Sequence, residues 1–341
     1  MGIRRVTVAI CTWNRHALLR QTLQQMTLLR VPAHIEWELL IVNNNCSDAT
    51  DAVIKDFISK LPVRRVFQPV PGLSNARNLA SLESKGDFII WTDDDVLVTP
   101  EWLEEYVKAF ETYPDAAIFG GPIAPWFPVA PPSWLEQAWA QVSNAYACID
   151  YGMVAVSLTA QRVPFGANMA VRKDCVAKYP YDPYLGVRPG SRMGGEETDV
   201  IRRALTDGHT GWWIPAACVR HYIPPERQTL KYLRRWFYAY GMYLGRHEDA
   251  DNRTAQLLGR PRWLWKQMIV TELRYQIRRH LNDPKVWVAY MIAASSARGQ
   301  MRPPNLPTKR RTDRAMQPAT QTAQPTTQTA QPTTQTAQPA S

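Results

Sequence analysis

The feature that most restricts the fold is the regular alternation of short apolar runs with amphipathic segments between residues 6 and 120. Each apolar run is long enough for one buried strand, and each intervening segment has the apolar spacing of a helix. The expected strands are residues 6–11, 39–42, 65–68 and 88–92, and the expected helices include residues 17–29 and 48–61. This alternation predicts an α/β domain whose mostly parallel sheet is flanked by helices.

The rest of the chain departs from this pattern. Residues 122–139 are rich in proline and tryptophan, which predicts an irregular, functional loop. Residues 229–302 mix large apolar side chains with arginine and lysine, which indicates a helical extension. Residues 303–341 end in a seven-residue repeat of Gln, Pro, Thr and Ala, which cannot bury enough apolar surface to fold. We therefore expect a domain at 1–228, a helical extension at 229–302 and a disordered tail at 303–341.

Charge and cysteine content narrow the possible partners and compartments. The 341 residues include 40 Lys and Arg against 30 Asp and Glu, and the net charge of +10 favours an anionic partner. Such a partner could be phosphate ligands, nucleic acid or an acidic membrane surface. The 5 cysteines lack Cys-x-x-Cys spacing, as is typical of a reducing compartment. No apolar run approaches the roughly 20 residues that cross a bilayer, so we expect a cytoplasmic protein that is soluble or peripheral at the membrane.

Three consecutive carboxylates, Asp93, Asp94 and Asp95, directly follow the apolar run at residues 88–91. Adjacent carboxylates repel one another, and a cation or solvent must offset that repulsion for all three to stay ionised. Because α/β sheets bind ligands at the carboxyl ends of their strands, this position favours Mg²⁺ or Mn²⁺ held jointly with substrate phosphates. A solvated acidic turn is the alternative, and the triplet alone does not decide between them.

Two further segments carry polar residues suited to a nucleotide. Asn43, Asn44 and Asn45 follow the second expected strand and precede good helix-capping residues. Arg77 lies in a Gly-Leu-Ser-Asn-Ala-Arg-Asn segment and puts a fixed positive charge near the same sheet edge. A guanidinium in that place suits a diphosphate.

A second acidic segment, Glu196, Glu197 and Asp199, precedes an expected helix at residues 200–205. Crowding among carboxylates can raise the pKa of one of them and suit it to general-base catalysis. The alternative is charge complementarity between acidic side chains and a helix N-terminus.

Six segments in this order together resemble the family 2 glycosyltransferases, which have the GT-A fold. They are VTVAICTWNR, IVNNNCSDAT, GLSNARNLA, IIWTDDD, PFGANMAVRK and GGEETDVIRRAL. The resemblance covers residues 6–240. It implies a Rossmann-like, mostly parallel sheet and the transfer of a sugar from a nucleoside-diphosphate sugar to an acceptor hydroxyl, with inversion of the anomeric carbon.

The resemblance also implies roles on the donor side. The residues implied to line the nucleotide site are Thr12, Arg15, Asn43, Asn44, Asn45, Arg77, Asp93 and Asp94. A divalent cation, Mn²⁺ or Mg²⁺, is implied at Asp95 with help from Asp94, and His221 resembles a further metal ligand of some GT-A enzymes. The family often has Asp where Asn43 stands, which leaves the identity of the nucleotide open.

On the acceptor side, Glu197 matches the catalytic base, and Glu196 and Asp199 would support the acceptor site. Processive members carry Gln-x-x-Arg-Trp, whereas this chain lacks the Gln before Arg235 and Trp236, which favours single sugar addition. The implied acceptor is a glycan or a lipid-linked glycan, with possible peripheral membrane contact and no nucleic acid.

Two alternatives remain open at this point. One is a non-catalytic relative that binds glycans or a membrane surface through residues 229–300. The other is a single-stranded nucleic-acid-binding protein, suggested by the mixture of arginine and aromatic residues at 231–279.

Overall fold

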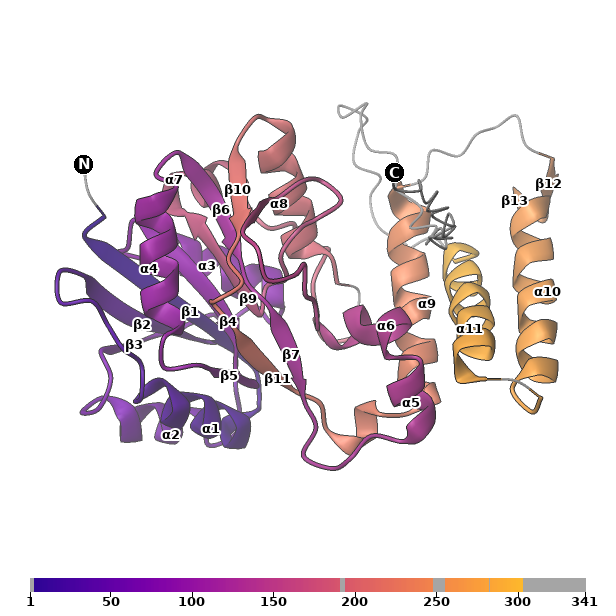
Figure 1. Ribbon diagram of the computed structural model, residues 1–341, viewed down its shortest axis with the longest axis horizontal. Coiled ribbons are helices and arrows are strands. Elements are labelled where there is room, and N and C mark those ends of the chain that lie inside the picture. The colour runs from indigo at the N-terminus through magenta and orange to yellow at the C-terminus, as the bar shows by residue number, and fades with distance from the viewer. Residues whose placement is uncertain (1–2, 191–193, 248–254, 282, 303–341) are drawn as a thin grey trace, which may run out of the picture. The chain divides into compact units, whose positions relative to one another are not determined.

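The computed structural model describes residues 3–190, 194–247, 255–281 and 283–302, and Figure 1 shows a central sheet with helices on both sides. The strands of the main sheet are β1 (Arg5–Thr12), β2 (Glu36–Asn43), β3 (Val63–Phe67), β4 (Phe88–Asp93), β6 (Ala116–Gly120), β8 (Val156–Ser157), β9 (Asn168–Arg172) and β10 (Thr210–Trp213). Their order is β3-β2-β1-β4-β9-β6-β10-β8. Strands β1 to β4 pair in parallel, and β9 runs antiparallel between β4 and β6.

Besides the main sheet, this part of the chain forms several helices and a second sheet of three strands. The helices are α1 (His16–Met26), α2 (Thr50–Phe57), α3 (Leu73–Glu83), α4 (Trp102–Thr112), α5 (Ser133–Gln137), α6 (Trp139–Val142), α7 (Lys173–Lys178) and α8 (Glu196–Thr206). The second sheet contains β5 (Val96–Val98), β11 (Val219–Tyr222) and β7 (Ile123–Trp126), in that order. The predicted α/β architecture is confirmed, and the four expected strands correspond to β1 to β4.

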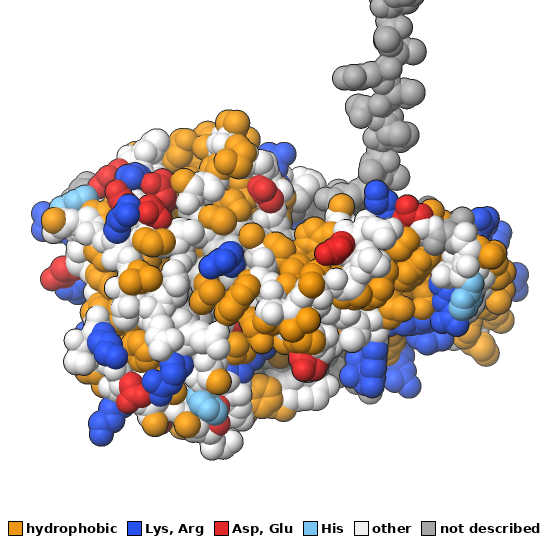
Figure 2. Space-filling model, turned by 60° about the horizontal axis from the view of Figure 1, so that its bottom comes forward, with side chains coloured by type: hydrophobic (Ala, Val, Ile, Leu, Met, Phe, Trp, Pro, Cys, Tyr) orange, Lys and Arg blue, Asp and Glu red, His pale blue; other side chains and the backbone are white. Residues whose placement is uncertain are grey.

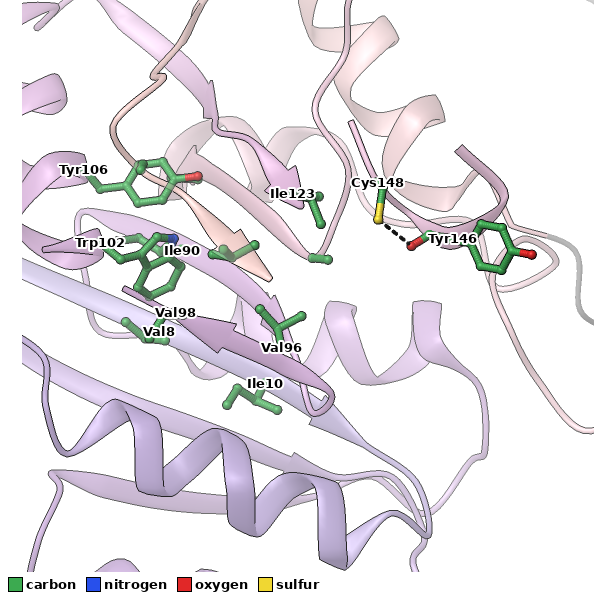
Figure 3. Close-up of a cluster of buried hydrophobic side chains, with 14 of the residues drawn as sticks. Val8, Ile10, Ile90, Val96, Val98, Trp102, Tyr106, Ile123, Tyr146 and Cys148 are labelled. Atoms are coloured by element: carbon green, nitrogen blue, oxygen red, sulfur yellow. Dashed lines mark hydrogen bonds between the residues drawn. The ribbon is translucent and has the colours of Figure 1, made fainter. Parts of the chain in front are cut away.

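Both faces of the main sheet are buried because successive side chains of a strand point to opposite sides. On one face, Val8 and Ile10 of β1 belong to a cluster with residues of α1, α2 and α4. Figure 3 shows part of this cluster, including Trp102 and Tyr106 of α4. On the other face, Ala9 of β1 lies in a second cluster with residues of α3, α7 and α8. Burial on two sides explains why these strands are continuously apolar.

The prediction that residues 122–139 are irregular throughout is wrong, because they contain β7 and α5. Strand β7 includes Pro125, which pairs in register with His221 of β11. Since β7 is an edge strand of its sheet, the missing N–H of proline removes no hydrogen bond from an inner ladder.

Residues 229–302 are mainly helical, as expected. They form α9 (Leu230–His247), α10 (Arg262–Arg278) and α11 (Pro284–Gln300), with a small hairpin of β12 (Gln256–Leu257) and β13 (Arg260–Pro261). Leu233 and Phe237 of α9 and Met291 of α11 belong to the same hydrophobic cluster as Val8 of β1. The domain boundary at 228/229 stays a prediction, and the predicted tail at 303–341 lies outside the described residues. In the described ranges, every helix is too short or too polar to span a bilayer.

Helices α9 and α11 approach each other closely at two glycines. A Cβ atom on Gly241 would lie 2.0 Å from the carbonyl oxygen of Ser296. A Cβ atom on Gly299 would likewise lie 2.0 Å from the carbonyl oxygen of Tyr238. Since the obstructing atoms are backbone atoms, no change of side-chain rotamer can make room, and a larger residue must separate the helices.

We predict that Gly299→Ala lowers the free energy of unfolding by about 1–3 kcal/mol, the usual cost of overpacking. The loss should occur although alanine favours a helix over glycine by about 1 kcal/mol. Urea denaturation measures it, with Arg298→Ala at the exposed neighbouring position as the control. If both variants are equally stable, the close helix contact is not formed in solution.

Candidate active site

The guanidinium of Arg77 lies at the centre of the candidate site. Arg77 is on α3, and its side chain is 3% exposed. Its Nη1 lies 3.2 Å from Oε1 of Glu196 and 3.6 Å from Oε2 of Glu197, and its Nη2 lies 3.9 Å from Oδ1 of Asp93. One buried positive charge therefore contacts both acidic motifs of the sequence.

The surroundings of Arg77 hold the guanidinium in this position. Its Cζ atom lies 5.8 Å from the ring centre of Trp91 and 5.6 Å from that of Tyr181, in cation–π contact with both. A Cβ atom on Gly166 would lie 2.0 Å from Nη2, so only glycine leaves room there. Burial lowers the pKa of Arg77, but the nearby carboxylates, chiefly that of Glu196, raise it above its ordinary value. The structure thus places the guanidinium of Arg77 against both acidic motifs, and its expected position near the nucleotide stays a prediction.

Glu196 and Glu197 begin α8, which follows Gly195 in the left-handed region at φ 97°. The side chain of Glu196 is 4% exposed, and burial together with the charge of Glu197 raises its pKa to about 8, although Arg77 opposes the shift. The side chain of Glu197 is 17% exposed, and its Oε2 has no hydrogen-bond partner among the described residues. Glu197 is therefore the more accessible carboxylate of the two. Asp199 instead pairs with Arg203 one turn along α8, at 2.9 Å.

The second and third carboxylates of the aspartate triplet are held from the β1 side. The Thr12 hydroxyl donates to Oδ2 of Asp94 at 2.7 Å. Arg15 Nη1 donates to Oδ1 of Asp94 and to Oδ2 of Asp95, at 2.9 Å each. Burial raises the pKa of Asp94 to about 6, although Arg15 opposes the shift. Burial also acts to raise the pKa of Asp95, but the imidazole of His221 and the guanidinium of Arg15 lower it below the ordinary value.

Asp93, Asp95 and His221 form a group that can hold a metal ion. Each offers a ligand atom, and these atoms all lie within 4.8 Å of one another. Oδ1 of Asp95 lies 3.3 Å from Nε2 of His221, and Nδ1 of His221 is buried without a hydrogen-bond partner in the described part of the chain, which leaves it free for a ligand. The oxygen and imidazole ligands suit Mn²⁺ or Mg²⁺. Asp93 was expected to meet the ribose or the metal, and it belongs to this group, whereas the carboxylate of Asp94 bonds to Thr12 and Arg15.

The three asparagines after β2 differ in their hydrogen bonds and backbone conformation. The Asn43 side chain donates to Asp51 at 2.6 Å and accepts from the backbone N–H of Cys46 at 2.8 Å, so both of its ends are occupied. Asn44 Oδ1 is buried and has no partner among the described residues. Asn45 has a positive φ of 57°. Asn44 is therefore the member that retains an acceptor for a ligand.

Sequence reasoning missed several residues that shape the site. Arg227 Nη2 lies 3.7 Å from Oδ2 of Asp95, but nothing in the sequence distinguishes Arg227 from the other arginines nearby. Gly166 and Asn168 lie in the PFGANMAVRK segment, which was interpreted only as a strand. Asn168 is fully buried and makes four side-chain hydrogen bonds, with α4 and with the backbone before β7 and β11. The glycine at 166, two residues before Asn168 at the start of β9, was a signal available in the sequence.

Comparison with known protein families gives two matches. The model described as glycosyl transferase family 2 matches residues 7–151, and that described as glycosyl transferase family group 2 matches residues 88–294. The succinoglycan biosynthesis protein ExoM of Rhizobium meliloti is 24% identical over 253 residues, which cover 71% of this chain and 74% of that protein. The glucosyl-dolichyl phosphate glucuronosyltransferase of Haloferax volcanii is 25% identical over 205 residues, which cover 58% of this chain and 63% of that protein.

Solved structures of other proteins have a fold similar to that of this chain. The mannosyltransferase PcManGT from Pyrobaculum calidifontis, in complex with GDP-Man and Mn²⁺, matches with a TM-score of 0.55 and 14% identity over 87% of each chain. TarS from S. aureus, in complex with UDP-GlcNAc, matches with a TM-score of 0.50 and 12% identity over 87% of this chain and 91% of its own. These likenesses show the GT-A fold, and the match to more than half of the sequence shows the family. The chain belongs to the family 2 glycosyltransferases and is a glycosyltransferase enzyme.

Proposed function

We propose that this enzyme moves one sugar from a nucleoside-diphosphate sugar to an acceptor hydroxyl, in a metal-dependent reaction that inverts the anomeric carbon. The observation that carries the proposal is the position of Arg77, which contacts Asp93 of the first acidic motif and Glu197 of the second. A metal-binding group and a candidate base thus flank one buried guanidinium. The two motifs are far apart in the sequence but belong to one site.

On the donor side, Asp93, Asp95 and His221 would hold a Mn²⁺ or Mg²⁺ ion. When bound, this cation supplies positive charge for the diphosphate of the donor. Thr12 and Arg15 keep Asp94 and Asp95 in place, since they make direct hydrogen bonds to both carboxylates. The GDP-Man, UDP-GlcNAc and Mn²⁺ bound to the structural neighbours support a nucleotide-sugar donor.

The Asn43, Asn44 and Asn45 turn lies beside Thr12, because the backbone N–H of Asn44 donates to the Thr12 carbonyl at 3.0 Å. In the proposal this turn faces the base or ribose of the donor, with Asn44 Oδ1 as the accepting atom. The side chain of Asn43 shapes the turn rather than contacting the nucleotide.

On the acceptor side, the carboxylate of Glu197 takes the proton of the attacking hydroxyl. The hydroxyl oxygen forms a bond to the anomeric carbon while the bond from that carbon to the diphosphate oxygen breaks. The nucleoside diphosphate leaves with the electron pair, and attack from the opposite face inverts the configuration. Glu196 has a raised pKa and retains its proton more readily, which leaves the more exposed Glu197 as the base.

The acceptor in this proposal is a glycan or a lipid-linked glycan of polysaccharide biosynthesis. One relative is named for succinoglycan biosynthesis, and another acts on a glucosyl-dolichyl phosphate by its name. A lipid-linked acceptor would bring the enzyme to the cytoplasmic face of a membrane. The domain at 1–228 would carry the chemistry and residues 229–302 would extend it.

We predict that Glu197→Gln lowers turnover by about 10²–10⁴-fold, the usual contribution of a general base. Donor affinity should stay within a few-fold, because the amide keeps the shape of the side chain. Release of nucleoside diphosphate from GDP-Man, UDP-GlcNAc and other donors measures turnover, and calorimetry measures donor affinity. Glu104→Gln, on the surface of α4, is the matched control. Wild-type turnover in a folded Glu197→Gln protein would remove Glu197 from the mechanism.

We also predict that donor affinity falls at least about tenfold in EDTA and recovers with Mn²⁺ or Mg²⁺, because a cation offsets the repulsion among the crowded carboxylates. Asp95→Asn should abolish the recovery. Asp48→Asn should retain it, because Asp48 bonds only to His16 and Thr50 at the start of α2. Calorimetry on the three proteins, with and without metal, checks this. Equal donor affinity in EDTA and in Mn²⁺ would show that the metal assignment is wrong.

A further inference from the structure

Helix α10 carries apolar side chains on two opposite faces. Leu264 and Tyr275 are buried, and α11 is the helix that packs against α10. On the far side, Ile269, Leu273 and Ile277 are 51%, 58% and 59% exposed. Residues four apart lie on one face of a helix, so these three form a continuous stripe. The stripe extends to Leu281 just beyond the helix, which is 74% exposed. We name these four residues the α10 stripe.

Basic side chains accompany the α10 stripe. The spacing of Arg262 and Lys266 from Ile269 puts these exposed residues on the same face of the helix. The one acid of α10, Glu272, is instead paired with Arg234 of α9. Trp263, at the start of α10, is 47% exposed. Figure 2 shows hydrophobic side chains intermixed with Lys and Arg on the part of the molecule that α9 to α11 form.

The basic side chains beside the α10 stripe indicate which kind of binding partner the stripe suits. In a symmetric dimer through α10, the basic side chains of one copy would face those of the other without acids to balance them. A nucleic acid would match the charge, but the stripe itself is aliphatic, and among the exposed residues of α10 only Trp263 offers a ring, too little for successive bases to stack on. A bilayer with anionic lipids matches both features, because aliphatic groups enter the interface while lysine and arginine reach the headgroups.

We propose that the α10 stripe with Arg262 and Lys266 is a membrane-contact surface, on which α10 lies in the plane of a bilayer that contains anionic lipids. Apolar burial and attraction to the negative surface act together in such a contact. The surface would keep the enzyme near lipid-linked acceptors. This last consequence rests on the proposed function, whereas the membrane contact itself does not.

The test is co-sedimentation of the full-length chain with vesicles of phosphatidylcholine and phosphatidylglycerol at 3:1, in about 0.1 M salt. Wild-type protein should bind these vesicles and bind pure phosphatidylcholine vesicles more weakly. Leu273→Glu with Ile277→Glu should lower the partition coefficient at least about tenfold, because two apolar side chains no longer leave water. The matched control, Leu28→Glu with Leu82→Glu, changes two exposed leucines elsewhere by the same charge and should bind as wild type.

A second pair of substitutions tests the electrostatic part. Arg262→Gln with Lys266→Gln should weaken binding to the anionic vesicles by about fivefold per charge. It should change binding to pure phosphatidylcholine little. Melting temperature and turnover in vesicle-free solution should be unchanged in all these variants, which shows that they are folded.

Wild-type vesicle binding by the Leu273→Glu, Ile277→Glu protein would overturn the proposal. So would a dimer in analytical ultracentrifugation that this double substitution dissociates, or oligonucleotide binding that it abolishes. Vesicle binding is measured without donor or acceptor. A chain that binds vesicles as predicted but transfers no sugar would therefore contradict the proposed function and support the membrane contact.

Discussion

The contact between the buried guanidinium of Arg77 and three carboxylates is the interaction on which the rest of the site depends. A fully buried arginine is costly unless its charge is balanced, and here the carboxylates of Glu197 and Asp93 lie within 4 Å of it, together with Glu196, which adds its charge when it is ionised. The reverse also holds, because these carboxylates could not stay crowded at the end of the sheet without a cation beneath them. Gly166 leaves room for the guanidinium.

Two fixed positive charges, those of Arg77 and Arg15, organise the carboxylates of the site. Arg77 and the aromatic rings around it form a fixed support for Asp93 and Glu197, whose side chains are 32% and 17% exposed, whereas Asp95 is buried beside Arg15. Arg15 contributes a second fixed charge from the loop after β1. The protein thus assembles a preorganised polar site before any ligand arrives, which is the condition for strong electrostatic stabilisation of a transition state.

The sequence predicted the parallel half of the sheet well, because β1, β2 and β4 are uninterrupted apolar runs that each precede polar residues. It predicted the first acidic motif for the same reason, since carboxylates after an apolar run are conspicuous, and the second because three acids precede an expected helix. It could not predict which way each carboxylate turns. Asp94 lies in the turn between β4 and β5, where strand alternation no longer sets the direction of a side chain, and there it faces Thr12 and Arg15. The burial of Arg77 and the contact of Arg227 with Asp95 depend on tertiary packing, which leaves no local signal.

A double-mutant cycle between Arg77 and Glu196 measures the central interaction most directly. The proteins are Arg77→Met, Glu196→Gln and the double variant, and urea denaturation at about pH 9, where Glu196 is ionised, gives their free energies of unfolding. Arg77→Met alone should cost about 3–5 kcal/mol, because it leaves buried carboxylates unpaired. The double variant should recover part of that loss, with a coupling free energy of at least about 1 kcal/mol. Losses that add to within about 0.5 kcal/mol would contradict the account, since the two side chains would then not share a buried ion pair.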